Sequence, residues 1–169
     1  ALSSSPVAEL SFPSQLAVID GVLLSYLNEL RRPATSIFVL DISGSMEGDR
    51  IASLRDALLI LSGTKMDKQA SSRYSRFQSR ENVIMLTFDD QVYPEQHFYI
   101  NEKDKGESQY QAISQFAQRL EVAGGTAIYS AMDAAYKIAL KEQIAYPERM
   151  TSIVLLTDGE NREGLSAAQ

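Results

Sequence analysis

The sequence predicts an α/β fold, with a mainly parallel sheet, one antiparallel edge strand and helices on both faces. Two nearly continuous apolar runs, residues 36–41 and 152–157, are rich in β-branched side chains, as strands buried on both faces of a parallel sheet are. Between them lie segments with apolar residues at helical spacing. With 169 residues, 44% of them hydrophobic, the chain is long enough for one domain with its own core and too short for two.

The first part of the chain predicts a helix, a strand and a second helix. Residues 1–13 contain Ser and Pro without periodicity and are expected to form a lead-in. A helix over 16–30 rests on apolar residues at helical spacing, namely Leu16, Ile19, Leu23, Leu27 and Leu30. It ends before Arg31. After the strand 36–41 and a loop over 42–48, we expect Asp49 to cap a helix that Gly63 ends.

The remaining elements complete the sheet. Residues 83–88 form a second strand, and a turn at 89–91 joins it to a strand over 92–100, which should therefore lie antiparallel at an edge. Helices are expected over 107–120 and from about 127 to 140, with a break at Gly124 and Gly125 between them. The last strand is 152–157. This order of elements predicts a mainly parallel sheet with helices on both faces.

Composition and charge exclude several functions. Lys and Arg number 16 against 22 Asp and Glu, and the resulting net charge of −6 argues against nucleic acid or an anionic membrane as partner. Without cysteine there is no thiolate zinc site and no Cys nucleophile. The single histidine, His97, lies in a polar-apolar alternation that favours a half-solvated strand position over catalysis. The longest apolar run, 16–24, is too short to span a bilayer.

Three polar segments follow strands or precede a helix, and they carry the candidate site. Asp41, Ser43 and Ser45 follow the first strand, Thr126 precedes a helix, and Asp158 follows the last strand. In an open α/β sheet the carboxyl ends of the strands line the crevice where ligands bind. Two carboxylates and three hydroxyls suit a hard divalent cation, and Mg²⁺ or Mn²⁺ fits better than Ca²⁺. Since the two carboxylates only balance the cation's charge, it can accept a carboxylate from outside.

These residues resemble the metal-ion-dependent adhesion site of the von Willebrand factor A domain family, over residues 35–169. The family's pattern is Asp-x-Ser-x-Ser, a distant Thr, and an Asp commonly followed by Gly; here these are Asp41, Ser43, Ser45, Thr126 and Asp158. The resemblance implies a Rossmann-like domain with Mg²⁺ bound directly by the two serine hydroxyls and by the Thr or one Asp, the rest acting through water. It also implies that Gly44 and Gly125 line the ligand-binding surface.

A simpler interpretation of the same residues stays open at this point. Ser43 and Ser45 could belong to a polar turn in which they cap the following helix. The two glycines at 124–125 could be an ordinary helix break. Three segments in the right order, each at an expected strand end or helix start, favour the metal site over this alternative.

The first functional hypothesis is a noncatalytic, metal-dependent protein-binding module for adhesion or assembly, in which a partner's Asp or Glu completes the Mg²⁺ shell. Bacterial proteins that join an extracytoplasmic solute-binding-like domain to such a module look similar, and an envelope location rests on that resemblance alone. A second hypothesis is a Mg²⁺-dependent phosphohydrolase with Asp41 as nucleophile, although Ser43 stands where such enzymes place their acid-base residue. A third is an intracellular chelatase- or ATPase-associated assembly factor.

The expected domain organisation is a linker and helix over 1–34 followed by the von Willebrand factor A domain over 35–169. The resemblance implies further helices and about two more strands after Asp158, so we expect the C-terminal part of the domain to be missing from this sequence. The strand 152–157 would then have one bare edge, which recruits another strand or aggregates. Candidates to cover it are the missing residues, the segment before Pro33, or a second copy in a dimer.

Overall fold

The computed structural model describes residues 15–65, 76–101 and 107–159. The chain divides into two compact units, Ala1–Arg31 and Arg32–Gln169. In the first, α1 (Gln15–Ser25) continues into a π-helical turn, η1 (Tyr26–Leu30), which confirms the predicted helix and its end before Arg31. The predicted lead-in over 1–13 lies outside the described residues. Among the helices that the structure describes, none has the length and apolar character needed to cross a membrane.

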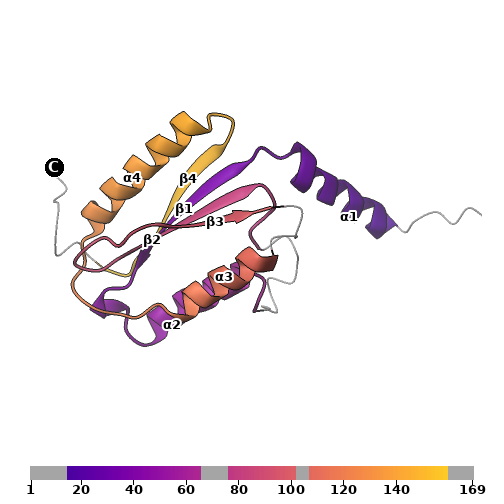
Figure 1. The fold of residues 1–169 in the computed structure, drawn as a ribbon. Coiled ribbons are helices and arrows are strands. Elements are labelled where there is room, and N and C mark those ends of the chain that lie inside the picture. The colour runs from indigo at the N-terminus through magenta and orange to yellow at the C-terminus, as the bar shows by residue number, and fades with distance from the viewer. Residues whose placement is uncertain (1–14, 66–75, 102–106, 160–169) are drawn as a thin grey trace, which may run out of the picture. The chain divides into compact units, whose positions relative to one another are not determined.

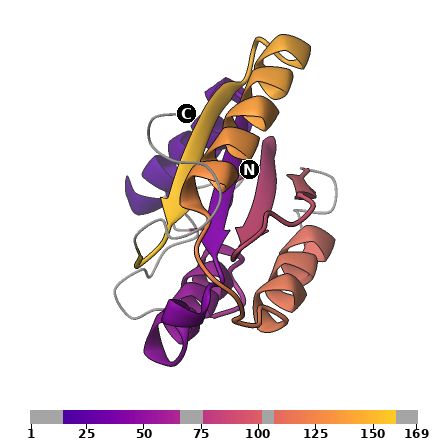
Figure 2. The same cartoon turned by 90° about the vertical axis from the view of Figure 1, so that its left-hand side faces the viewer.

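The second unit contains a four-stranded sheet in the order β3-β2-β1-β4 (Figure 2). Its strands are β1 (Ala34–Asp41), β2 (Glu81–Phe88), β3 (Gln96–Ile100) and β4 (Met150–Leu156). The central strand β1 pairs in parallel with β2 and with β4, whereas β3 runs antiparallel to β2. The sheet is therefore mainly parallel with one antiparallel edge strand, which confirms the fold class predicted from the sequence.

Helices cover both faces of the sheet (Figure 1). Two of them, α2 (Asp49–Leu61) and α3 (Glu107–Gln118), pack on one face, where Phe38 and Leu40 of β1 meet them. The third, α4 (Ile128–Ala145), packs on the other face against Ile37 and Val39. Because successive side chains of a strand point to opposite faces, a strand between two helical layers must be apolar at nearly every position. All eight residues of β1 are buried accordingly.

Several boundaries differ from those predicted, and the edge strand expected over 92–100 covers only Gln96–Ile100. Gly48, not Asp49, is the N-cap of α2, and its φ of +81° is a backbone conformation that glycine adopts without strain. The fourth helix runs to Ala145 rather than ending near 140. Its last turns are polar and so lack the apolar periodicity that the prediction followed, but Glu142 holds them to the sheet by accepting hydrogen bonds from Thr35 at 3.1 Å and Asn82 at 3.2 Å.

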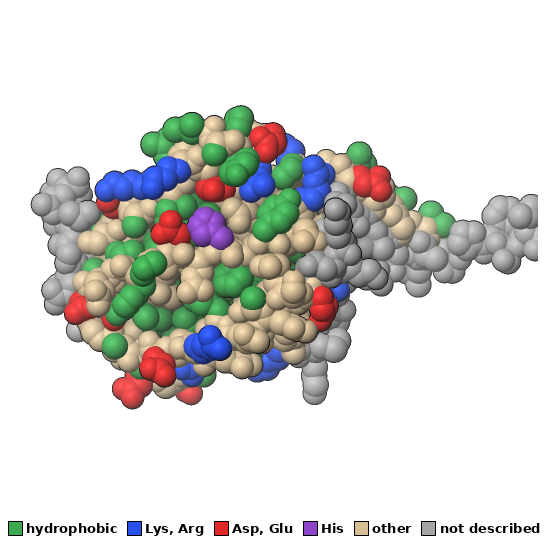
Figure 3. Space-filling view, viewed as in Figure 1, with side chains coloured by type: hydrophobic (Ala, Val, Ile, Leu, Met, Phe, Trp, Pro, Cys, Tyr) green, Lys and Arg blue, Asp and Glu red, His purple; other side chains and the backbone are tan. Residues whose placement is uncertain are grey.

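The edge strand β4 has a pairing partner on one side only in the described part of the chain. It pairs with β1 on one side, and no strand of the described chain pairs with its other side. Its residues are exposed or half-buried, with Val154 37% exposed. The predicted bare edge of this strand is thus present in the described part of the chain. On the face drawn in Figure 3, cationic and anionic side chains of the described residues are interspersed, without a field of a single sign.

Candidate metal site

The register of β1 and β4 brings the first and last polar segments together. Leu40 of β1 lies opposite Leu156 of β4. One residue further along, Asp41 and Thr157 are neighbours at the carboxyl edge of the sheet. The loop between α3 and α4 lies against the same edge, because the Ala123 amide donates to the Ile42 carbonyl at 2.9 Å. The three segments predicted to form the site therefore meet in one place.

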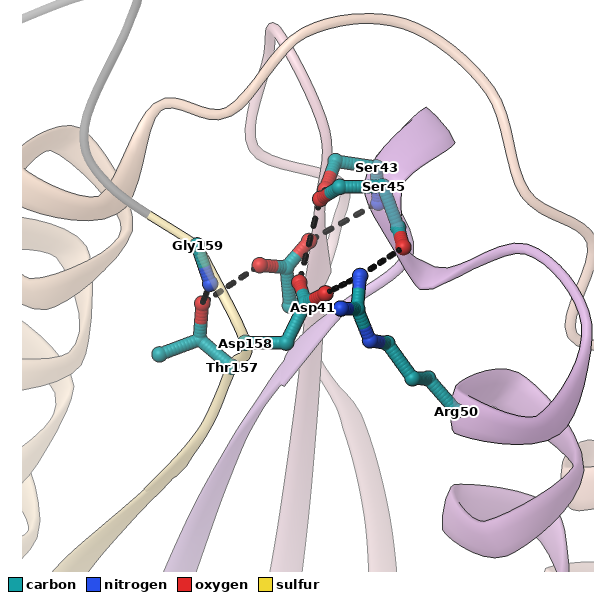
Figure 4. Close-up of polar contacts among 7 residues, drawn as sticks. All are labelled: Asp41, Ser43, Ser45, Arg50, Thr157, Asp158 and Gly159. Atoms are coloured by element: carbon teal, nitrogen blue, oxygen red, sulfur yellow. Dashed lines mark hydrogen bonds and ion pairs between the residues drawn. The ribbon is translucent and has the colours of Figure 1, made fainter.

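Asp41 is fully buried, and both of its carboxylate oxygens accept hydrogen bonds (Figure 4). Oδ1 accepts the backbone N–H of Ser43 at 2.8 Å. Oδ2 accepts the hydroxyl of Thr157 at 2.5 Å. One bond thus comes from the loop that follows β1 and the other from the residue that follows β4. These bonds fix the orientation of a buried carboxylate, whose charge would otherwise be costly to remove from water.

A chain of short contacts joins the two serines to Asp158. The hydroxyls of Ser43 and Ser45 lie 3.0 Å apart, and Ser45 donates to Oδ1 of Asp158 at 3.0 Å (Figure 4). Ser43 is the N-cap of the short 3₁₀ helix η2 (Gly44–Met46), but its side chain makes no capping bond, and the N-cap of α2 is Gly48. Neither hydroxyl caps a helix, which argues against the simple polar turn.

Thr126 reaches the same place from the other loop. It is buried, and it directly precedes Ala127, the N-cap of α4, so its hydroxyl lies at a helix start as predicted. A Cβ atom placed on Gly159 would lie 3.5 Å from Ser45 Oγ and 3.9 Å from Thr126 Oγ1. Both hydroxyls therefore face one backbone position, the residue after Asp158.

The segments that carry the five predicted ligands thus meet at one edge of the sheet, where the side chains of Ser43, Ser45 and Asp158 are in contact, and the side-chain donors of all five residues are oxygens. The described residues contain no group of three or more His, Cys, Asp or Glu side chains that could hold a metal ion. The only chemistry available to a cation here is the mixed set of two carboxylates and three hydroxyls. Such oxygen ligands suit a hard divalent ion such as Mg²⁺ or Mn²⁺ better than a borderline or soft ion, and the two carboxylates only balance its charge.

The other predicted residues fall around this centre. Gly44 is exposed, and its amide donates to the Gly124 carbonyl at 3.2 Å; Gly125 is half-buried. Their predicted role in ligand binding stays a prediction. His97 is exposed on β3, two strands from β1, in the solvated position that the alternation predicted.

Sequence reasoning gave no role to two residues that hold the carboxylates. The hydroxyl of Thr157 donates a hydrogen bond to Asp41. In the sequence, Thr157 is simply the last residue of an apolar run, and nothing there indicates this bond. Arg50, in the first turn of α2, forms an ion pair with Asp158 and donates to the Ser45 carbonyl at 2.8 Å (Figure 4). The sequence does hold an indication of this role. A cation in the first turn of a helix is disfavoured by the helix dipole, so an anionic partner for Arg50 could be expected.

The turn that follows β2 supports the loop carrying Thr126. Asp89 is buried and accepts the Gln91 amide at 3.0 Å and the Tyr93 hydroxyl at 2.7 Å, so the predicted turn is confirmed. Burial alone would raise the pKa of Asp89, but these hydrogen bonds outweigh it and hold that pKa below its ordinary value of 3.8. The carbonyl of Asp89 accepts the Ala127 amide at 2.7 Å, which fixes the start of α4.

Comparison with known proteins identifies several relatives of this chain. Inter-alpha-trypsin inhibitor heavy chain H1 of Mesocricetus auratus is 28% identical over 131 residues, which are 76% of this chain and 13% of that protein. The uncharacterized protein sll0103 of Synechocystis is 29% identical over 138 residues, 81% of this chain and 28% of that one. The chain spans 13–28% of the length of the curated relatives it matches.

A solved structure and a family model agree with these relatives. The structure of a von Willebrand factor type A protein from Catenulispora acidiphila superposes with a TM-score of 0.53 at 19% identity, over 80% of this chain and 29% of that one, and so shares the fold. The family model of the von Willebrand factor type A domain matches residues 36–160, from β1 past Asp158. The chain therefore belongs to the von Willebrand factor type A domain family.

Proposed function

We propose that this domain binds protein ligands through a divalent cation, Mg²⁺ or Mn²⁺, held at the metal-ion-dependent adhesion site formed by Asp41, Ser43, Ser45, Thr126 and Asp158. Domains of this family generally mediate protein interactions and are not enzymes. The observation that carries the proposal is the chain of side-chain contacts from Ser43 through Ser45 to Asp158, beside the buried Asp41, at the carboxyl edge of the sheet. Residues that served only a turn would not need to converge from three loops.

The charge of the site supports an acidic ligand. Asp41 and Asp158 supply two negative charges, and the three hydroxyls supply none. A bound divalent cation would therefore offer an electrophilic position to one further anionic oxygen. The group that fits is the carboxylate of an Asp or Glu side chain on a partner protein. The bacterial envelope location expected from the resemblance is part of this proposal.

The phosphohydrolase alternative is disfavoured by the residue that follows Asp41 at the acid-base position. Enzymes of that kind place a second acidic residue two positions after the nucleophilic Asp, and this position is Ser43. A serine hydroxyl is a poor proton donor and acceptor near neutral pH compared with a carboxyl group. The intracellular assembly factor uses the same site, and differs from the adhesion module in compartment and partner.

Calorimetric titration of the protein with Mg²⁺ and with Mn²⁺ at millimolar concentration tests the metal site. Asp41→Ala should abolish binding and Ser43→Ala should weaken it, both with the fold intact by circular dichroism. Matched controls are Asp133→Ala and Ser53→Ala, because both side chains lie on exposed helix surfaces and bond only within their own helices. Metal binding that survives Asp41→Ala unchanged contradicts the assignment.

The ligand and the chemistry are tested separately. With Mn²⁺ present, poly-L-glutamate should bind and poly-L-glutamine should not, and chelation of the metal should release the glutamate polymer. An aryl phosphate with Mg²⁺ should release no phosphate. Steady release that Asp41→Asn removes would favour the phosphohydrolase instead.

We also propose that a second copy can pair with the open side of β4. An unprotected apolar edge strand presents a row of unpaired backbone groups to another strand. Self-association through this edge is independent of the metal site, since β4 meets the site only at its carboxyl end.

A further inference from the structure

Arg50 contacts two of the candidate metal ligands, Asp158 and Ser45. Its guanidinium pairs with Oδ2 of Asp158, and the same Nη1 atom donates to the Ser45 carbonyl at 2.8 Å (Figure 4). Both partners belong to the five-residue site. The remaining oxygen of Asp158, Oδ1, accepts the Ser45 hydroxyl. Arg50 thus neutralises one of the two carboxylates on which a divalent cation would depend.

The position of Arg50 in α2 is not explained by helix stability. It is the second residue of the helix, where the partial positive charge of the exposed amides disfavours a cation. The next residue, Ile51, is buried in the core, whereas the Arg50 side chain is 60% exposed. The Arg50 side chain therefore contacts the candidate metal site and not the hydrophobic core in which Ile51 is buried.

The two partners of the ion pair differ in their freedom to move. The Asp158 side chain is only 17% exposed, while that of Arg50 is mostly in water. A long, exposed arginine can leave its partner and regain hydration at little cost. The less exposed carboxylate needs a compensating positive charge whether or not Arg50 stays.

We propose that Arg50 is a tethered counter-ion of Asp158 that a divalent cation has to displace, and that it thereby sets the metal affinity of the site. This inference rests on the proposed function. With Arg50 in place, Asp41, Asp158 and Arg50 together carry a net charge of −1 toward an incoming cation; without it, the site carries −2. Arg50 in this sense competes with the metal for Asp158.

The test is calorimetric titration with Mn²⁺ of the wild-type chain and three variants at one ionic strength. Arg50→Ala should bind Mn²⁺ about tenfold more tightly than wild type, the size of a single-charge effect across a few ångströms of hydrated protein. Arg50→Gln removes the charge and keeps a donor for the Ser45 carbonyl, so it should behave like Arg50→Ala. Arg50→Lys keeps the charge and should stay close to wild type.

Lys65→Ala is the matched control. It removes one positive charge beyond the opposite end of α2, whose 13 residues span about 20 Å, so its field at the site is screened at ordinary ionic strength. It should leave Mn²⁺ affinity unchanged. Thermal unfolding of each variant without metal verifies that the fold is retained, and the Gln variant keeps the test decisive if the Ala variant does not fold.

The outcomes separate the inference from the proposed function. If wild type binds Mn²⁺ and both neutral variants bind it equally or more weakly, Arg50 does not compete and the inference is wrong, while the metal site stands. If no variant and no wild-type sample binds Mn²⁺, the proposed function fails and the inference falls with it. Tighter binding in both neutral variants but not in Arg50→Lys or Lys65→Ala supports the inference.

Discussion

Replacing Thr157 with valine should destabilise the domain, because it removes the side-chain hydrogen bond from the residue that follows β4 to the carboxylate of Asp41. The hydroxyl donates to Oδ2 of a carboxylate that is fully buried, at 2.5 Å. Valine has nearly the same shape, so the substitution removes the donor without opening a cavity. In the variant, one oxygen of a buried charge loses its partner, and the Ser43 amide alone continues to bond Asp41.

The expected cost follows from the kind of bond. A hydrogen bond to a charged group contributes about 1.5–3 kcal/mol, and because one bond to Asp41 remains, we expect a loss of about 2 kcal/mol of unfolding free energy at pH 7. Thr157 Oγ1 also accepts the Gly159 amide at 3.2 Å. Because Gly159 is only half-buried, water can replace this contact in the valine variant. For a chain of this size the loss corresponds to roughly 4–8 °C in Tm.

Urea unfolding followed by circular dichroism measures this loss, with Thr157→Ser as the matched control. Serine keeps the hydroxyl and removes one half-buried methyl group, so it should cost less than about 1 kcal/mol. The reasoning is refuted if the valine variant is as stable as the serine variant, because the hydroxyl would then contribute nothing to the folded state.

Three further predictions concern the neighbourhood of the site and the sheet edge. Gly124→Ala should lower the unfolding free energy by about 1–3 kcal/mol, because φ is +65° and a Cβ would lie 3.1 Å from Asp89 Cγ; Gly21→Ala, with open space around it, is the control. Tyr93→Phe should destabilise the domain at pH 7. Since the Tyr93 hydroxyl holds the pKa of Asp89 below 3.8, that stabilisation is present above pH 3.8 and is lost as pH falls through the lowered pKa, so the urea curves of the two proteins should converge as the pH is lowered below 3.8. Val154→Lys should lower the mass seen by light scattering if copies pair through β4, and a wild-type protein that is already monomeric contradicts that pairing.

Most of the fold could be predicted from the sequence, because a strand buried on both faces has a nearly continuous run of apolar residues. The apolar run in β1 predicts a central strand, and β1 is central. The run Ile153, Val154, Leu155 and Leu156 has the same pattern, yet β4 is an edge of the described sheet. The same apolar pattern therefore accompanies a fully buried central strand and an edge strand whose residues are exposed or half-buried, so the pattern alone does not give a strand's place in the sheet.

The hydrogen bond and the ion pair that hold the two carboxylates could not be predicted from the sequence, because their partners are far apart along the chain. Thr157 and Asp41 are 116 positions apart, and Arg50 and Asp158 are similarly distant. Such pairs depend on the register of β1 against β4, and a shift of one residue would turn Thr157 to the other face. The family motif names the oxygen donors, but it does not name the groups that compensate their charge before a cation arrives.

Those compensating groups offset the charges of the two carboxylates that lie at one edge of the sheet. Asp41 is held by a backbone amide and the Thr157 hydroxyl, and Asp158 is held by the Ser45 hydroxyl and Arg50. Each carboxylate therefore has its own donors, and folding does not have to wait for metal to offset their repulsion. It follows that metal should bind a preformed site. Its affinity is then set by the competition for Asp158 rather than by the ordering of the loops, which is why Arg50, and not the glycines, is the residue to change first.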